Sequence, residues 1–129
     1  MKRNLLEDGI ARILVADDSL LIRSLVQELL VEDGFQVVTA VDGLEAWEYL
    51  QKESFHLLIA DLTMPLTDGL ELTRMIRADE QLGALPVILM SAVDTIEDRQ
   101  RALMCGADAF VLKEKGALES LTAMINGLQ

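Results

Sequence analysis

The sequence lacks several features that would place it in well-defined classes of protein. It contains a single cysteine, Cys105, so an internal disulfide is excluded, which fits a reducing cytoplasm. No apolar run approaches the ~20 residues of a membrane-spanning helix, and no signal peptide is visible at the start. Basic residues are scarce, 11 against 22 acidic ones, and the net charge of −11 would repel the phosphates of a nucleic acid. We therefore expect a cytoplasmic protein that binds neither a membrane nor nucleic acid directly.

The sequence does have enough apolar material for one folded core. Hydrophobic residues make up 51% of the 129 residues and fall in short periodic runs, as in a globular chain. The first ten residues show no clear period. We expect residues 1–10 to be a leader or the remnant of a linker, and residues 11–129 to form one domain.

Apolar runs alternate with segments of helical period along this domain. The runs predict strands at residues 12–16, 35–40, 56–60, 86–91 and 108–112. Apolar residues recur at helical spacing between and after the strands, with Ser19, Asp42 and Thr95 placed as helix caps. The helix after Thr95 has a thin apolar face, for which Ile96 and Leu103 are the main candidates. The pattern predicts an α/β fold, a doubly wound five-stranded parallel sheet with five helices.

Polar residues end four of the predicted strands, all at what would be the same edge of the sheet. They are Asp17 and Asp18, Asp61, Ser91 and Lys113. Any one of them alone would be an ordinary polar strand end, but together they are typical of a site at the carboxyl edge. Three converging carboxylates repel one another, and a hard cation with oxygen ligands relieves that repulsion. We therefore predict a Mg²⁺ site at this edge.

Four motifs that contain these residues point to a known family. They are VADDS around Asp17 and Asp18, IADLTMPLTDG around Asp61, MSA around Ser91, and GADAFVLK ending at Lys113. In register they resemble the receiver domain of response regulators, the flavodoxin-like (βα)5 module of two-component phosphorelays and chemotaxis signalling. The resemblance covers residues 11–128.

The resemblance implies a role for each acid. Asp61 matches the residue that accepts a phosphoryl group, while Asp17 and Asp18 match the pair that holds Mg²⁺. Asp61 itself and the backbone carbonyl of Thr63 match the other protein ligands of that cation. The chemistry is consistent with this, because a carboxylate that attacks phosphorus must be ionised and a nearby cation favours the ionised form.

Three further residues match the family's phosphoryl-sensing parts. Lys113 matches the lysine that contacts the phosphoryl group, Ser91 the switch hydroxyl, and Phe110 the switch aromatic. A contact between Ser91 and the phosphoryl group would draw the following loop inward and shift the conformation of the Ser91/Phe110 face. Other interpretations stay open at this point: Phe110 could simply pack in the core, and Ser91 could merely cap a turn.

The implied function is Mg²⁺-dependent transfer of a phosphoryl group to Asp61. The donor would be the phosphohistidine of a sensor histidine kinase or histidine phosphotransfer protein, or a small phosphodonor. Such a protein is not an enzyme in the usual sense, because it catalyses only its own phosphorylation and dephosphorylation, and its downstream target is unknown. Leu20, two residues after Asp18 and predicted to face solvent, is our candidate contact for the phosphohistidine partner.

Rival functions are judged on the same residues. The alternative that stays open is a receiver-like interaction module that is not phosphorylated, although intact Asp61, Ser91 and Lys113 weigh against it. A phosphatase of the haloacid-dehalogenase kind needs a second acid where Thr63 stands. A flavodoxin needs a phosphate-binding loop of Ser, Thr and Gly after the first strand, where this chain has two acids.

One departure from the family concerns the residue after the lysine. The family usually has a proline there, joined by a cis bond, whereas Lys113 is followed by Glu114. A cis bond before a residue other than proline costs ~3 kcal/mol. The sequence therefore leaves open whether the Lys113–Glu114 peptide is cis or trans.

Overall fold

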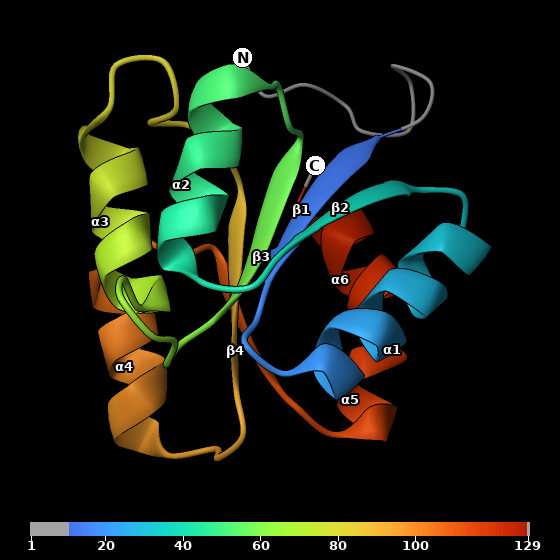
Figure 1. The fold of residues 1–129 in the computed structure, drawn as a ribbon. Coiled ribbons are helices and arrows are strands. Elements are labelled where there is room, and N and C mark those ends of the chain that lie inside the picture. The colour runs from blue at the N-terminus through green and yellow to red at the C-terminus, as the bar shows by residue number, and fades with distance from the viewer. Residues whose placement is uncertain (1–10, 129) are drawn as a thin grey trace.

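A computed structural model describes residues 11–128 as alternating strands and helices (Figure 1). The predicted leader, residues 1–10, and Gln129 lie outside the described residues. The strands are β1 (Arg12–Ala16), β2 (Gln36–Ala40), β3 (Leu57–Asp61), β4 (Val87–Ser91) and β5 (Ala109–Leu112). The helices are α1 (Leu20–Glu32), α2 (Gly43–Lys52), α3 (Gly69–Ala78), α4 (Ile96–Met104), α5 (Lys115–Leu118) and α6 (Leu121–Gly127). Each predicted strand is confirmed to within one residue at either end.

The strands form one parallel sheet in the order β2-β1-β3-β4-β5. Helices α2, α3 and α4 cover one face of the sheet, and α1, α5 and α6 cover the other (Figure 1). The central strands β3 and β4 are buried along their whole length, which is why they are almost entirely apolar. The predicted doubly wound α/β fold is therefore confirmed.

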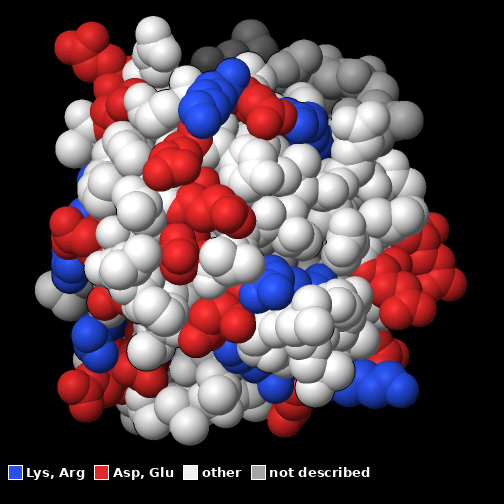
Figure 2. All heavy atoms as spheres, viewed as in Figure 1, with Lys and Arg blue, Asp and Glu red and all other residues white. Residues whose placement is uncertain are grey.

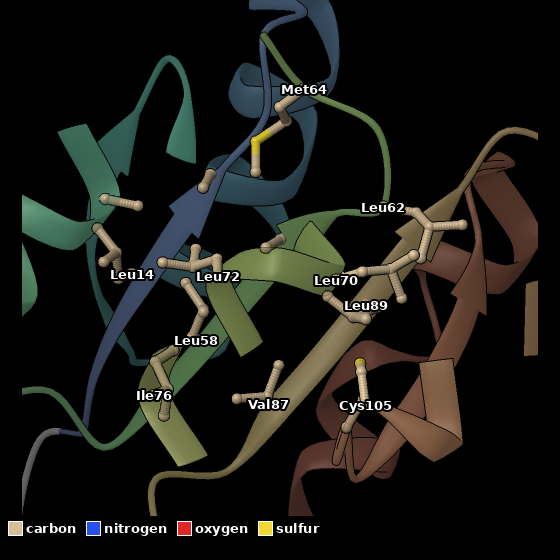
Figure 3. Close-up of a cluster of buried hydrophobic side chains, with 14 of the residues drawn as sticks. Leu14, Leu58, Leu62, Met64, Leu70, Leu72, Ile76, Val87, Leu89 and Cys105 are labelled. Carbon is tan, nitrogen blue, oxygen red and sulfur yellow. The ribbon is translucent and has the colours of Figure 1, made fainter. Parts of the chain in front are cut away.

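Alternate residues of each strand supply two separate apolar cores. Leu14, Leu58 and Leu89 point to the face covered by α2, α3 and α4 (Figure 3). Their neighbours along the strands, among them Ile59 and Ile88, point to the face covered by α1, α5 and α6. This two-sided burial follows from the period of two in a strand, and it holds the strand ends in a fixed register.

Side-chain caps determine where four helices begin. Each cap oxygen accepts the backbone N–H of the residue three positions later, at 2.8 to 3.3 Å. The caps are Ser19, Asp42, Asp68 and Thr95. Three of these were predicted from the sequence, and the fourth, Asp68, starts α3 beside the strand end that carries Asp61.

The structure corrects two predictions about helices. The single helix predicted at the end of the chain is divided into α5 and α6, with a break at Glu119 and Ser120. The predicted apolar face of α4 is wrong, because Ile96 and Leu103 are 77% and 60% exposed and Ala102 is the buried residue. Ile96 and Leu103 share a stripe that lies about 100° around the helix from Ala102, since successive residues advance by about 100°.

The surface carries the excess of acidic residues that the composition predicts. Figure 2 shows acidic side chains over α2 and at the end of α1 that leads to β2. Among the described residues, no helix combines the length and apolar character needed to cross a bilayer.

Candidate functional site

The register of the sheet brings the polar strand ends together. Ala16 of β1 pairs with Ala60 of β3, so the residues that follow them, Asp17 and Asp61, are neighbours at the carboxyl edge. Ser91, the last residue of β4, pairs with Leu112 of β5, which directly precedes Lys113. The backbone N–H of Lys113 donates to the carbonyl of Ser91 at 2.7 Å and fixes the start of the following loop.

Three carboxylates converge at this edge. One oxygen from each of Asp17, Asp18 and Asp61 lies within 4.8 Å of the others. Asp17 is fully buried and Asp61 is 6% exposed, whereas Asp18 faces solvent. Asp17 is also held in orientation, because its Oδ1 accepts the N–H of Ser19 at 2.8 Å. An all-oxygen donor set of this kind, partly buried and open on one side, fits a hard divalent cation such as Mg²⁺.

Lys113 lies between two of these acids. Its Nζ donates to Asp61 Oδ2 at 2.8 Å and to Asp17 Oδ2 at 2.9 Å, and its side chain is 11% exposed. All peptide bonds of residues 11–128 are trans, including the bond from Lys113 to Glu114. The lysine therefore reaches the acids without the proline that the family usually has at the next position.

Burial and charge shift the pKa values of this pair. Burial raises the pKa of the Asp61 carboxyl above 3.8, and the neighbouring charge of Asp17 adds to the rise, while the hydrogen bond from Lys113 opposes it. Burial tends to lower the pKa of the Lys113 ammonium, but its hydrogen bonds to Asp61 and Asp17 outweigh this and the pKa is raised above 10.5. At neutral pH Lys113 is therefore protonated, and its positive charge faces the carboxylates of Asp17 and Asp61.

The loop after β3 wraps closely around Asp61. The N–H of Thr63 donates to Asp61 Oδ1 at 3.2 Å, and the N–H of Gly69 donates to the carbonyl of Leu62 at 3.1 Å. A Cβ on Gly69 would lie 2.3 Å from the carbonyl oxygen of Asp61, so only glycine permits α3 to begin this close to the acid. Thr63 itself is exposed at the mouth of the site.

A depression of about 240 Å³ opens beside Asp61. Its walls include three further predicted site residues, Thr63, Ser91 and Lys113. The walls also include Asp68 at the start of α3 and the side chains of Asp98 and Arg101 from α4, which the sequence interpretation missed. Asp68 lies within the IADLTMPLTDG motif but was given no role there, and Asp98 and Arg101 lie outside all four motifs. The approach of these three residues to Asp61 depends on how α3 and α4 pack on the sheet.

Ser91 and Phe110 lie where the sequence placed them, but each has a local partner. Ser91 is 5% exposed and its Oγ accepts the N–H of Val93 at 3.2 Å. Phe110 is 8% exposed and packs in the core shared with α4. The guanidinium of Arg99 covers the ring at 4.9 Å from its centroid, and Asp94 pairs with Arg99. In this structure Phe110 therefore packs in the core, and the side chain of Ser91 caps a turn.

The fold and the residues of the site together define the class of protein. A five-stranded parallel sheet with an acid pair, a central aspartate, a hydroxyl and a lysine at its carboxyl edge is the arrangement of receiver domains. The family model described as the response regulator receiver domain matches residues 13–126, and the chain belongs to this family.

Individual relatives agree with this assignment. The chain is 34% identical over 117 residues to a gliding motility regulatory protein of Myxococcus xanthus; the match covers 91% of this chain but 15% of that protein. It superposes on the chemotaxis response regulator CheY4 of Vibrio cholerae with a TM-score of 0.86 and 30% identity, over 94% of this chain and 100% of that one. It also superposes on the Mn²⁺-bound form of response regulator Rcp1 with a TM-score of 0.75 and 25% identity, over 92% and 91% of the two chains.

Proposed function

We propose that residues 11–129 form a receiver whose Asp61 accepts a phosphoryl group in a Mg²⁺-dependent reaction. The donor is a phosphohistidine of a sensor histidine kinase or histidine phosphotransfer protein, or a small phosphodonor. The observation that carries the proposal is the position of Lys113, which joins Asp61 to the buried Asp17 at the wall of an open depression. A structural ion pair needs no such opening, whereas an incoming phosphoryl group does.

The divalent cation would be held by the carboxylates of Asp17, Asp18 and Asp61 and by the carbonyl of Thr63. When bound, it supplies positive charge that neutralises the acids and the oxygens of the phosphoryl group. The similar response regulator Rcp1 is described in a Mn²⁺-bound form, which supports a divalent cation as the ligand. The rest of the chemistry belongs to the protein's own side chains.

Asp61 acts as the nucleophile. An oxygen of its carboxylate forms a bond to phosphorus, the bond from phosphorus to the histidine nitrogen breaks, and the electron pair of that bond stays on the imidazole. Lys113 already donates to Asp61, so a small movement lets its ammonium donate to a phosphoryl oxygen instead. Water reverses the modification: its oxygen forms a bond to phosphorus, the bond from phosphorus to the Asp61 oxygen breaks, the carboxylate keeps that electron pair, and inorganic phosphate leaves. Both reactions take place on the protein's own aspartate, and the phosphorylated protein serves as the signal.

A phosphoryl group on Asp61 also offers a new hydrogen-bond acceptor to the hydroxyl of Ser91. The Oγ of Ser91 accepts an N–H from Val93 and is free to turn its own proton toward a phosphoryl oxygen across the depression. Such a contact draws the loop before α4 inward and strains the stack of Arg99 on Phe110. Helix α4 is easily shifted, because Ala102 is its one buried residue among those described, against five in α3.

Hydrogen exchange tests this switch. Beryllofluoride with Mg²⁺, which mimics the phosphoryl group, should change amide protection in α4 and β5 and in the α5–α6 segment more than elsewhere. Phe110 of β5 packs in the core that includes α4, and Val111, the next residue of β5, packs in the core that includes α5 and α6. Exchange measured by mass spectrometry with and without beryllofluoride provides the comparison. A change limited to peptides around Asp61 would mean that no switch is transmitted.

The direct test of the phosphoryl-transfer proposal is labelling of the purified chain by acetyl phosphate. We expect a mass gain of one phosphoryl group with Mg²⁺ and none with EDTA, because without the cation the single charge of Lys113 faces three carboxylates, whose excess negative charge repels the anionic donor. Intact-protein mass spectrometry gives the result. Labelling at the same rate in EDTA would contradict a role for a divalent cation.

The start of α1 is the proposed contact for the phosphohistidine partner. Leu20 and Leu21 are 69% and 76% exposed, one and two residues after the cap Ser19 and close to the acid pair. The core face of α1 is made by other residues, with Val26 and Leu30 buried. An exposed leucine gains about 1–2 kcal/mol when a partner covers it.

Leu20→Asp should therefore slow phosphoryl transfer from a phosphohistidine protein about tenfold, the equivalent of ~1.4 kcal/mol. Labelling by acetyl phosphate should be unchanged, because the small donor makes no use of α1. Val31→Asp is a matched control, since Val31 is 52% exposed at the other end of the same helix. Equal losses with both donors would show damage to the site itself, and normal transfer would place the docking surface elsewhere.

A further inference from the structure

Helix α4 contributes a pair of opposite charges to the phosphoryl-accepting depression. Asp98 and Arg101 both line it, together with Asp61, Ser91 and Lys113. The Nη1 of Arg101 lies 3.4 Å from Asp98 Oδ1, which is long for a charge-assisted hydrogen bond. The side chain of Arg101 is 54% exposed and that of Asp98 is 18% exposed. The arginine is thus weakly held and able to reorient.

The charges around the depression favour such a movement once a phosphoryl group is present. Lys113 is already engaged by two acids, Asp17 and Asp61. A phosphoryl group on Asp61 carries up to two negative charges where the free carboxylate carries one, and it extends toward the carboxylates of Asp68 and Asp98, which line the same depression. Arg101 is the second cationic side chain on the wall of the depression, and a guanidinium binds phosphoryl oxygens through two parallel N–H groups.

We propose that Arg101 is a second cationic contact for the phosphoryl group on Asp61 and for small anionic phosphodonors, and that it exchanges Asp98 for this group. The inference rests on the proposed phosphorylation of Asp61. It gives α4 a direct attraction to the modified site, in addition to the loop that Ser91 draws inward. Asp98 opposes the contact, because it competes for Arg101 and repels the incoming anion.

The chemistry of transfer is unchanged by this contact. With acetyl phosphate, a bond forms between the Asp61 oxygen and phosphorus, the bond from phosphorus to the bridging oxygen breaks, and acetate leaves with its electron pair. Arg101 stays protonated throughout, because a guanidinium does not release its proton in this pH range. Its part is to bind and orient the anionic donor and product.

The chain contains a close control for an ordinary surface ion pair. Arg74 of α3 pairs with Glu71 at 3.7 Å with the same spacing of three residues, and both side chains are exposed, at 59% and 57%. Neither residue lines the depression. Substitution of Arg74 therefore removes the same charge and the same kind of pair without touching the site.

The experiment compares initial rates of acetyl phosphate labelling for the wild-type chain and three variants with Mg²⁺. Arg101→Gln should slow labelling about threefold to fivefold, as expected for loss of one partly exposed charge contact. Asp98→Asn should speed it up, and Arg74→Gln should leave it unchanged. The difference between Arg101→Gln and wild type should shrink at high salt, because screening weakens exposed charge interactions. Thermal unfolding of each variant checks that the fold is intact.

The outcomes separate this inference from the function on which it rests. If the wild-type chain is labelled and Arg101→Gln and Arg74→Gln have the same rate, the role of Arg101 is overturned. A loss of rate in Asp98→Asn equal to that in Arg101→Gln would also overturn it, because the pair of Asp98 and Arg101 would then only stabilise helix α4. If the wild-type chain is not labelled at all, it is the proposed phosphorylation of Asp61 that fails.

Discussion

Asp61→Asn should abolish phosphoryl labelling by acetyl phosphate in the presence of Mg²⁺. An amide oxygen carries no negative charge and is far too weak a nucleophile to attack phosphorus, so the expected effect is complete loss and not a slower rate. Asp68→Asn is the matched control, because Asp68 lines the same depression but does not contact Lys113. Asparagine also caps a helix as well as aspartate does, so α3 should keep its start. Labelling of the Asp61→Asn variant at another residue would contradict the assignment of Asp61 as the phosphoryl acceptor.

The loss of labelling in this variant should not come from unfolding. Burial, with the charge of Asp17, raises the pKa of Asp61 above its ordinary value of 3.8. Since the folded-state pKa exceeds the unfolded one, the folded protein binds more protons, and the ionised carboxyl costs stability as pH rises through and beyond this window. Removing the charge at neutral pH therefore leaves the free energy of unfolding, measured by urea denaturation without Mg²⁺, equal to that of wild type or higher.

Lys113→Met should have the opposite effect on stability. Without the ammonium, Asp17 and Asp61 face each other with no positive partner among their present contacts, and loss of one member of a buried pair costs about 3–5 kcal/mol. Urea denaturation in EDTA should show this loss, and Mg²⁺ should restore part of it by replacing the missing charge. The labelling rate should fall about 100-fold even with Mg²⁺, as for removal of one preorganised donor to a reacting oxygen.

The pH dependence of the lysine's contribution has a definite sign. The pKa of Lys113 is raised above 10.5 in the fold, so its stabilisation is complete below that pH and is lost as pH rises through the folded-state value. Lys115→Met is the control, because Lys115 is exposed and its loss should change neither stability nor labelling. A wild-type free energy of unfolding in Lys113→Met would contradict the buried ion bridge.

The parts of the structure that depend on strands were predictable from sequence. Short continuous apolar runs predict both the strands and the positions where they end, so the convergence of Asp17, Asp61, Ser91 and Lys113 at one edge follows from a parallel sheet. The class of the domain followed from motifs in register, and the family match to residues 13–126 confirms it.

The parts that depend on helix packing were not predictable in the same way. Helix α4 has apolar residues on a stripe that the fold leaves in solvent, and Ala102, a small residue with little weight in a periodic pattern, is what lets the helix approach the sheet. The same packing brings Asp98 and Arg101 to the depression. The break between α5 and α6 leaves Leu118, Leu121 and Ile125 buried on one face, so the apolar spacing gives no sign of it.

The central claim, that Asp61 is the phosphoryl acceptor, is tested most directly by locating the modified residue in the wild-type chain. After labelling with acetyl phosphate and Mg²⁺, borohydride reduces an aspartyl phosphate to homoserine, and tandem mass spectrometry of the digested protein identifies its position. We predict homoserine at position 61, absent when EDTA replaces Mg²⁺. Homoserine at another position, or a phosphoryl group that resists reduction, would contradict the claim.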